Sequence, residues 1–535
     1  MNLSTKRWAY AVWLLLIGVF AALHFAHLRA DFPNHSPWIE DWAKYTDEGW
    51  YGNAAVRAHL LGQWYLPGDF NPAPAMPVWP FLEWLLFFVT GVNIVAARAL
   101  AVTFFCLDLL LGYLLLRHRA PRWVGLLAVT LAVTSPFLYA FSRLAILEPM
   151  LLAFFLAALN LAVRLPQLRR PVMASAAIGL LFTLMMLTKT SAAFLLPALG
   201  WAMFVPLWRD RRRAWRCIFA AAVAAALSFG GWMALLTRSG LMREFKYLIY
   251  INTYPKPTEW YWPLLSFWWS LRGALWGGRI LMALAALVVV AVPIAGRAGW
   301  SRFLRRDPVF GSAAIAALGY LLFMTYQNHP QPRYYTVVAL FAYLIVARGA
   351  QALLAMSPEL PRSVGMPISG AAIAGLVLLL ATATAEVRNA VWTLSYVAHP
   401  EYTFVTAAEQ LTRYVDAHPN GNRLLVSISG DEIAMITHLP SLCDDFGTQD
   451  LPSKLAHYQP GWWATWNDID TGTLEDLHVH YSIQQVASFR ALDHPERNML
   501  VLFKLHPLPN GAARQPVGNN LQVALPGDRI AIPIE

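Results

Sequence analysis

Charged residues are scarce in this sequence. Of its 535 residues only 13% are Asp, Glu, Lys or Arg, whereas 57% are hydrophobic, and soluble domains ordinarily carry about 25% charged residues. Long apolar runs accompany this shortage, so we expect a polytopic membrane protein. The formal net charge is +10, but the Lys and Arg residues gather in short loops between apolar runs. That is the positive-inside pattern of membrane proteins, and it argues against a nucleic acid as partner.

Cysteine is almost absent, with three residues in the chain. Cys106 and Cys217 lie inside apolar runs and Cys443 stands alone in a polar region, so no disulfide framework is expected. The sequence also lacks glycine motifs of the Walker and Rossmann types, which argues against a nucleotide-driven pump and against a nucleotide-binding catalytic domain. No internal repeat is evident.

The apolar runs predict about eleven transmembrane helices if each must cover roughly 20 residues. Basic loops fall on one side at every return, which puts the N-terminus, with Lys6 and Arg7, in the cytoplasm and the C-terminus outside. The first run has no clear cleavage site, so we interpret it as an uncleaved span. Residues 77–91 are short and contain Glu83, and they predict a membrane-surface or re-entrant helix. The predicted spans are, approximately, 9–28, 94–116, 123–140, 148–164, 172–188, 191–207, 217–236, 276–296, 308–326, 334–347 and 366–385.

From about residue 387 the composition changes to that of a soluble domain. We therefore divide the chain into a transmembrane domain, residues 1–386, and a C-terminal α/β domain, residues 387–535. About 150 residues suffice for a small domain of this kind. The predicted topology puts this domain on the outer, extracytoplasmic face.

Sequence patterns predict several elements of the C-terminal part. Residues 402–418 carry their apolar side chains on one helical face and predict an amphipathic helix. Residues 423–429 and 498–504 predict strands. We interpret the acidic stretches 430–432 and 444–445 as solvated turns.

Ionisable side chains at membrane depth are costly and are therefore candidates for function. By the predicted topology the candidates gather at the outer face, and this co-location is the main physical argument for a site there. Carboxylates at a membrane surface suit general-base chemistry or metal binding, and cations beside them could neutralise a phosphate. The acidic candidates are Asp47, Glu48, Glu83 and Glu148, and the basic ones are Arg143, Lys189 and Arg333.

Each candidate also has a purely structural explanation. Asp47 could cap a loop helix, and Glu83 could point to water from an interfacial helix. Glu148, which a proline follows, fits an ordinary helix start. Lys189 could extend its ammonium group to the interface from the end of a span, and Arg333 could anchor the topology.

The segment 237–275, expected as a long outer loop, is crowded with aromatic residues and also carries Lys246. Aromatic side chains favour the membrane–water interface. An aromatic loop over a cavity would suit an isoprenoid-phosphate lipid, which is apolar along its tail and anionic at its head. An aromatic belt without a ligand is the alternative.

The membrane part, roughly residues 1–386, resembles the GT-C glycosyltransferases. The nearest branch is that of the bacterial protein O-mannosyltransferases and aminoarabinose transferases. The motif Asp47-Glu-Gly-Trp-Tyr-Gly-Asn-Ala-Ala-Val-Arg57 carries this resemblance, which continues through residues 91–98, Ser142-Arg143, Glu148-Pro149, residues 187–189 and Arg333-Tyr-Tyr335.

The resemblance implies an enzyme of the bacterial inner membrane that moves a hexosyl or pentosyl group. The donor would be a polyprenyl-phosphate sugar, and the acceptor would be a glycan, lipid or protein outside the cytoplasm. Asp47 would be the general base of an inverting displacement, and Glu148 matches the second acidic position. The candidates for binding substrate or lipid phosphate are Glu48, Arg57, Glu83, Arg143, Lys189, Lys246, Arg333 and Tyr334.

Two departures from the family pattern limit what the resemblance implies. Many relatives carry a Lys-Pro-Pro element where residues 71–80 have prolines but no Lys, which argues against a lipid A aminoarabinose transferase. The second acidic position is Glu148 rather than the commoner Asp, so use of a divalent metal ion is left open. Two other classes remain as alternatives: a transporter or flippase of lipid-linked sugars, and a non-catalytic scaffold protein.

Overall fold

The computed structural model describes residues 3–254, 256–296, 298–355 and 370–508. The chain forms two compact units. The helical unit comprises residues 1–26, 101–239 and 253–399, and the sheet unit comprises residues 27–100, 240–252 and 400–535. The sheet unit thus combines the predicted C-terminal domain with the first polar loop after span one. Residues 509–535 of that predicted domain lie outside the described residues.

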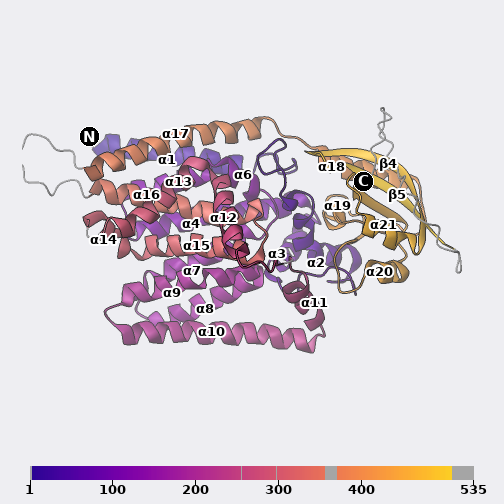
Figure 1. Ribbon diagram of the computed structural model, residues 1–535, viewed down its shortest axis with the longest axis horizontal. Coiled ribbons are helices and arrows are strands. Elements are labelled where there is room, and N and C mark those ends of the chain that lie inside the picture. Colours follow the sequence, from indigo (N-terminus) through magenta and orange to yellow (C-terminus); the bar gives the residue numbers. More distant parts are fainter. Residues whose placement is uncertain (1–2, 255, 297, 356–369, 509–535) are drawn as a thin grey trace, which may run out of the picture. The chain divides into compact units, whose positions relative to one another are not determined.

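Helices that pack side by side make up the helical unit (Figure 1). Helix α16 (Tyr335–Ala355) is buried over almost its whole length and is the centre of the packing. Helix α10 (Arg211–Arg238) instead exposes large apolar side chains such as Phe219 and Leu227, as a lipid-facing helix does. The other elements are α1 (Leu3–Leu23), α4 (Ile94–Arg117), α5 (Arg122–Val133), α6 (Pro136–Ser142), α7 (Glu148–Ala162), η2 (Leu165–Gln167), α8 (Pro171–Thr188), η3 (Thr190–Leu195), α9 (Leu196–Phe204), η4 (Val205–Leu207), α12 (Trp262–Gly273), η6 (Ala274–Gly277), α13 (Arg279–Ile294), α14 (Gly299–Arg305), α15 (Pro308–Gln327), η7 (Pro332–Tyr334) and α17 (Gly370–Ala398).

The prediction of a polytopic α-helical membrane protein is confirmed. Within the described residues, seven helices are long and apolar enough to cross a membrane, and two bent helix pairs raise the number to nine. Three further apolar segments, Arg7–Leu23 of α1, Val78–Thr90 and Glu148–Ala162, are shorter than these. The eleven predicted spans correspond to the seven helices, the two bent pairs, α1 and α7.

The bend between α5 and α6 has a local cause. Ser135 accepts a hydrogen bond from the N–H of Leu138 and so caps a new helix, and Pro136 opens that helix. Proline cannot donate the backbone hydrogen bond that would continue α5, so the chain turns by 67° at this point.

Two boundaries differ from the sequence-based expectation. The segment 237–275 was expected as a loop, but much of it is helical: α11 (Met242–Lys246), the π-helix η5 (Tyr247–Ile251) and α12. A proline at the start of α12 favours helix initiation there. The domain boundary expected after residue 386 falls inside α17, because the helix continues beyond the end of the apolar run.

A five-stranded sheet in the order β2-β1-β3-β5-β4 organises the sheet unit. Strand β1 (Leu425–Val426) pairs in parallel with β2 (Ser441–Leu442) and with β3 (Trp462–Trp466). Strand β5 (Arg497–Pro507) pairs antiparallel with β3 and with β4 (Tyr481–His494). The strand predicted at 498–504 is thus confirmed within β5, the one predicted at 423–429 is found only over Leu425–Val426, and the α/β class of this part is confirmed.

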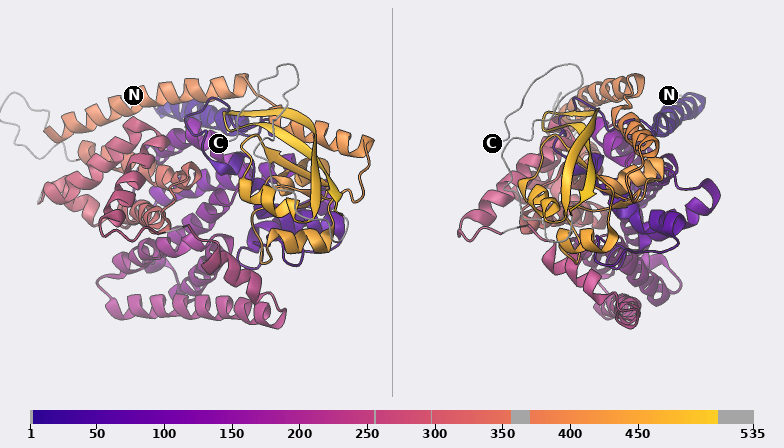
Figure 2. Two further views of the ribbon diagram at one scale, coloured as in Figure 1. Left: turned by 45° about the vertical axis from the view of Figure 1, so that its right-hand side comes forward. Right: turned by 90° about the vertical axis from the view of Figure 1, so that its right-hand side faces the viewer.

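Alternating side chains of the central strands build one core on each face of this sheet. Trp462 and Trp466 pack with helix α18 (Thr403–Ala417) on one face, whereas Trp463 packs with α20 (Leu451–Tyr458) and α21 (Thr471–His478) on the other. Figure 2 shows helices on both sides of the sheet. The amphipathic helix predicted at 402–418 is confirmed as α18. The remaining elements are η1 (Trp42–Lys44), α2 (Asp47–Leu61), α3 (Val78–Thr90) and α19 (Gly430–Thr437).

Candidate functional site

Helix α2 of the sheet unit begins with the two adjacent carboxylates of the first polar loop. Asp47 and Glu48 form its first turn, and both are buried. Acidic side chains are stabilised there because the first backbone N–H groups of a helix carry partial positive charge. Thr46 occupies the cap position, so Asp47 opens the helix rather than capping it.

The two carboxylates have different partners. Arg98 donates from Nε to Glu48 Oε1 at 2.7 Å and from Nη2 to Oε2 at 2.5 Å, which is a bidentate ion pair. The same guanidinium donates to the carbonyl oxygens of Leu28 and Ala30. Asp47 instead accepts hydrogen bonds at 3.2 Å from the hydroxyls of Thr46 and Tyr51. A guanidinium therefore engages both oxygens of Glu48, and the partners of Asp47 include two hydroxyl groups.

Helix α19 packs directly on α2. A Cβ at Gly49 would lie 2.1 Å from the backbone nitrogen of Glu432, so only glycine permits this approach. Asp431 accepts hydrogen bonds from Asn53 at 3.1 Å and from Arg57 at 3.2 Å. The interpretation of residues 430–432 as a solvated turn is wrong: they begin a helix, and both acids are buried.

Glu432 is a residue of this site that the sequence interpretation missed. Neither of its carboxylate oxygens has a hydrogen-bond partner in the part of the chain that the structure describes. Burial raises its pKa well above the usual value, and the negative charge of Glu48 adds to this effect while Arg98 opposes it. The raised pKa favours the neutral form of Glu432, in which its carboxyl group can donate a hydrogen bond.

Glu83 lies in α3 and is fully buried rather than directed to water. A Cβ at Gly52 would lie 2.3 Å from its Oε2, so this carboxyl group packs against α2. Its oxygens have no hydrogen-bond partner of ordinary geometry among the described residues. Ionising such a group without a partner is costly, so the neutral form is favoured.

Two basic candidates of the sheet unit differ in their surroundings. Arg57 is buried and donates to Asp69 at 2.7 Å and to Asp431 at 3.2 Å, so its guanidinium holds α2 to the loop after it and to α19. Lys246 is exposed at the end of α11. A role in binding phosphate stays a prediction for both residues.

Four candidates of the helical unit come together. Glu148 opens α7 and forms an ion pair with Lys189, and both side chains are buried. The ammonium group of Lys189 lies 4.4 Å from the ring centroid of Tyr334, and the guanidinium carbon of Arg333 lies 4.8 Å from the same ring. Two cations thus lie against one aromatic ring, and one of them, Lys189, pairs with Glu148.

Arg143 follows the last residue of α6 and contacts Tyr139 of that helix. Its Nη1 donates to the hydroxyl of Tyr139 at 2.7 Å, and its carbon Cζ lies 4.5 Å from the centroid of that ring. Asp47 and Glu48 belong to the sheet unit, whereas Arg143, Glu148, Lys189 and Arg333 belong to the helical unit. That all of them share one face of the membrane stays a prediction.

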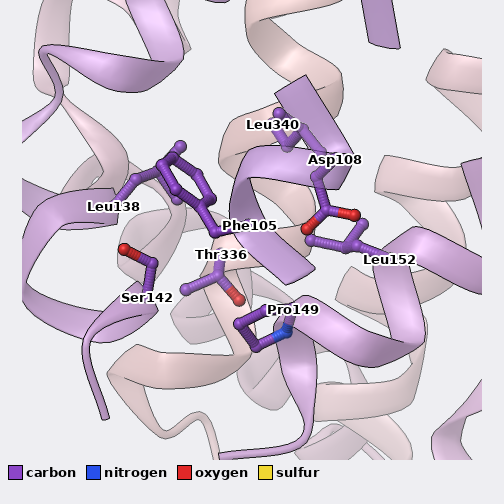
Figure 3. A pocket seen from close by; sticks show the side chains of 8 residues that line it. All are labelled: Phe105, Asp108, Leu138, Ser142, Pro149, Leu152, Thr336 and Leu340. Atoms are coloured by element: carbon purple, nitrogen blue, oxygen red, sulfur yellow. The ribbon is translucent and has the colours of Figure 1, made fainter. Parts of the chain in front are cut away.

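Asp108 is a second residue that the sequence interpretation missed. It lies within α4, is buried, and has no hydrogen-bond partner within the described residues. Figure 3 shows its carboxyl group beside a cavity of about 10 Å³ that Ser142, Pro149 and Thr336 also line. This volume accommodates roughly one water molecule. The sequence contains one signal that could have identified Asp108: it is a single acid inside an apolar run, and ionisable groups at that depth are rare.

No metal site is evident in the described ranges. Among these residues, no three or more His, Cys, Asp or Glu side chains are grouped so that they could hold a metal ion.

Comparisons with known proteins link this architecture to membrane glycosyltransferases. Residues 72–234 match the family model of the dolichyl-phosphate-mannose-protein mannosyltransferases, and no curated protein matches the chain. Among solved structures, apo ArnT from Cupriavidus metallidurans is 15% identical with a TM-score of 0.59, over 92% of this chain and 98% of that chain. The same protein bound to undecaprenyl phosphate is 16% identical with a TM-score of 0.58, over the same shares of both chains.

A third structure has the same fold at larger size. Archaeal oligosaccharyltransferase AglB from Archaeoglobus fulgidus, in complex with an inhibitory peptide and a dolichol-phosphate, is 11% identical with a TM-score of 0.53. The match covers 94% of this chain and 74% of AglB. The resemblance that the first-loop motif indicated is thereby confirmed at the level of the fold. The chain has the fold of the GT-C membrane glycosyltransferases, and its residues 72–234 match the dolichyl-phosphate-mannose-protein mannosyltransferase family.

Proposed function

We propose that this protein is a glycosyltransferase that uses a polyprenyl-phosphate sugar as donor. It transfers the sugar to an acceptor hydroxyl at the outer face of the bacterial cytoplasmic membrane, with inversion at the anomeric carbon. Asp47 takes the proton from the acceptor hydroxyl. The acceptor oxygen forms the new bond to the anomeric carbon as the bond from that carbon to the phosphate oxygen breaks, and the polyprenyl phosphate leaves.

The observation that carries this assignment is the place of Asp47, a buried carboxylate in the first turn of α2 that hydroxyl groups contact. A general base needs a lone pair that can reach an incoming hydroxyl. Arg98 engages both oxygens of Glu48, which suits a supporting role. Asp47 accepts hydrogen bonds from the hydroxyls of Thr46 and Tyr51, so hydroxyl groups reach its carboxylate, as an acceptor hydroxyl must.

A donor phosphate needs cationic partners, and the helical unit supplies them. Lys189 and Arg333 flank Tyr334, and Glu148 orients Lys189. We propose that these groups, with Arg143, bind the phosphate of the donor and stabilise it as it leaves. In support, two proteins with this fold have been solved with polyprenyl phosphates, ArnT with undecaprenyl phosphate and AglB with a dolichol-phosphate.

A transporter or flippase of lipid-linked sugars is the less favoured alternative. Such proteins carry ionisable groups near the membrane midplane, at a site between repeated halves. Asp108 is a buried acid within a span, but its cavity of about 10 Å³ is far too small for a sugar. The solved proteins of similar fold named above include an oligosaccharyltransferase.

Substitution of Asp47 by Asn tests the proposal. Asn keeps the size of the side chain and can still accept from Tyr51, but it cannot take a proton. Loss of a general base reduces rates by about 10²- to 10⁴-fold. We therefore expect D47N to lose sugar transfer to that extent, measured as transfer of radiolabelled sugar from membrane lipid to envelope acceptor, while the purified variant keeps its melting temperature.

The matched control is Glu40→Gln, which removes an exposed carboxylate from the same loop. This variant should transfer sugar at the rate of the unmodified protein. Transfer that survives in D47N would rule out Asp47 as the base. If deletion of the protein changed neither the lipid-linked glycans nor the envelope glycans, the assignment as a transferase would be ruled out.

A further inference from the structure

A cavity of about 610 Å³ lies in the sheet unit, and its lining does not include Asp47 or Glu48. Most of its lining residues follow the carboxyl ends of the three parallel strands: Asp444 and Asp445 come after β2, Ile428 after β1, and residues 467–470 after β3. Ligands of α/β proteins bind outside the carboxyl ends of parallel strands, and small-molecule sites have volumes of about 300–1,000 Å³. Position and size together identify a binding site.

The lining combines aromatic rings with carboxylates. Trp42, Tyr45 and Trp466 contribute the rings. Four aspartates and one arginine are the only charged groups among the described residues that line it: Asp444, Asp445, Asp468, Asp470 and Arg497. Rings present flat apolar surface, and carboxylates accept hydrogen bonds from hydroxyl groups. A sugar ring offers both matching features, since it has an apolar C–H face and a rim of hydroxyl donors.

Asp444 supplies an independent sign of a missing ligand. The side chain is 7% exposed and lines the cavity. Its Oδ2 accepts from Trp463 Nε1 at 3.3 Å, but its Oδ1 has no hydrogen-bond partner in the described part of the protein. A buried carboxylate oxygen left without a donor is costly, and ligand binding sites are where such groups persist. Burial, together with the charge of Asp445, raises the pKa of Asp444 to about 7.

Charge excludes an anionic occupant. Arg497 is already engaged, because it donates to the hydroxyl of Tyr45 at 2.9 Å and its guanidinium carbon lies 4.6 Å from the ring centroid of Trp42. A phosphorylated or uronic-acid ligand would therefore face the aspartates without a free cation, which is unfavourable. The described residues also hold no group of acids suited to a metal ion.

We propose that this cavity binds a neutral saccharide unit of the glycosyl acceptor. That the saccharide belongs to the acceptor rests on the proposed function, whereas its binding does not. The stacking partner is Trp42, whose ring Arg497 holds in place, and the hydroxyl acceptors are Asp444, Asp445 and Asp468. The sheet unit would thus select a glycosyl acceptor that already carries sugar.

Binding is tested on the full-length protein in detergent by isothermal titration calorimetry, without any donor. The probes are the neutral trisaccharides mannotriose, maltotriose and N-acetylchitotriose, with trigalacturonate as the anionic and trilysine as the cationic counterpart. We expect at least one neutral trisaccharide to bind, and trigalacturonate not to bind. The double variant Asp445→Asn/Asp468→Asn, which changes two exposed carboxylates, should weaken that binding about tenfold or more.

The matched control is Glu475→Gln, which removes an exposed carboxylate of α21 outside the cavity lining and should leave binding unchanged. The same titration on D47N separates the two proposals, because binding there should persist even if Asp47 proves not to be the base. Binding of trilysine alone, equal binding by the double variant, or no binding of any neutral trisaccharide would each overturn the inference.

Discussion

At the residue scale, a buried ion pair with Arg98 holds Glu48, the neighbour of Asp47 in the first turn of α2. Both side chains are buried, and the guanidinium satisfies two carboxylate oxygens and two backbone carbonyls at once. Buried ion pairs add little stability over an apolar pair, but removal of one partner leaves an uncompensated charge.

A double-mutant cycle tests this pair. Arg98→Met alone should destabilise the protein by roughly 3–5 kcal/mol, because it leaves Glu48 buried without its cation. The double variant Arg98→Met/Glu48→Gln should recover much of that loss, since neither charge remains. Thermal unfolding of the purified protein in detergent measures both, and each variant is compared at one detergent concentration.

An exposed ion pair of the same unit provides the control for this cycle. Arg29 and Glu409 pair at the surface, with side chains 53% and 39% exposed. Arg29→Ala should cost about 0–1 kcal/mol, because solvent screens such pairs. Equal losses for Arg98→Met and Arg29→Ala would show that the Glu48–Arg98 pair is not buried as described.

At the element scale, the contact between α2 and α19 joins the catalytic candidate to the C-terminal domain. Gly49 approaches the backbone of Asp431 and Glu432, and Asn53 and Arg57 bind the carboxylate of Asp431 from the next turns. The C-terminal domain is therefore part of the candidate site rather than an appendage. Its acid Glu432 lies where it can respond to the charge of Asp47 and Glu48.

Substitution of Gly49 by Ala tests whether this contact matters. The added methyl group would meet backbone atoms at 2.1 and 2.4 Å, which side-chain movement cannot relieve. Overpacking costs about 1–3 kcal/mol and more where backbone must shift. We expect G49A to lower the melting temperature and to reduce sugar transfer, since the first turn of α2 must move away from α19.

A glycine in open surroundings serves as the matched control. Gly230 lies in α10, and a Cβ there would meet no atom within 4 Å. Gly230→Ala should leave melting temperature and transfer unchanged or slightly raise the former, because alanine favours helix. If G49A behaved like G230A, close packing of α2 on α19 would be excluded.

At the scale of the whole molecule, the sequence predicted the fold class well and the site only in part. Hydropathy predicted the helical membrane region, and periodicity predicted α18 and β5, because both signals are local. The burial of Asp431 and Glu432 could not be predicted in this way. The partners of Asp431 on α2 lie more than 370 residues earlier in the chain, and an acidic stretch after a short strand has the same local pattern whether it is solvated or buried.

The same distinction holds for individual site residues. The pairing of Glu148 with Lys189 joins α7 to the end of α8, and the sequence indicated both residues but not their contact. Asp108 could have been identified as a candidate from the rule that acids are rare within spans. The cavity at the carboxyl ends of β2, β1 and β3 required the strand order, which no periodicity contains.

Membrane orientation is the remaining whole-molecule prediction, because it decides on which side Asp47 acts. The positive-inside pattern puts the C-terminal domain outside and the loop before α10 in the cytoplasm. The native cysteines give little background, since Cys217 and Cys443 are buried and Cys106 is partly so. A membrane-impermeant maleimide should therefore label Glu475→Cys in intact spheroplasts, and should label Arg212→Cys only after lysis; both positions are exposed. The reverse pattern would move the α/β domain, and the transfer reaction with it, to the cytoplasmic face.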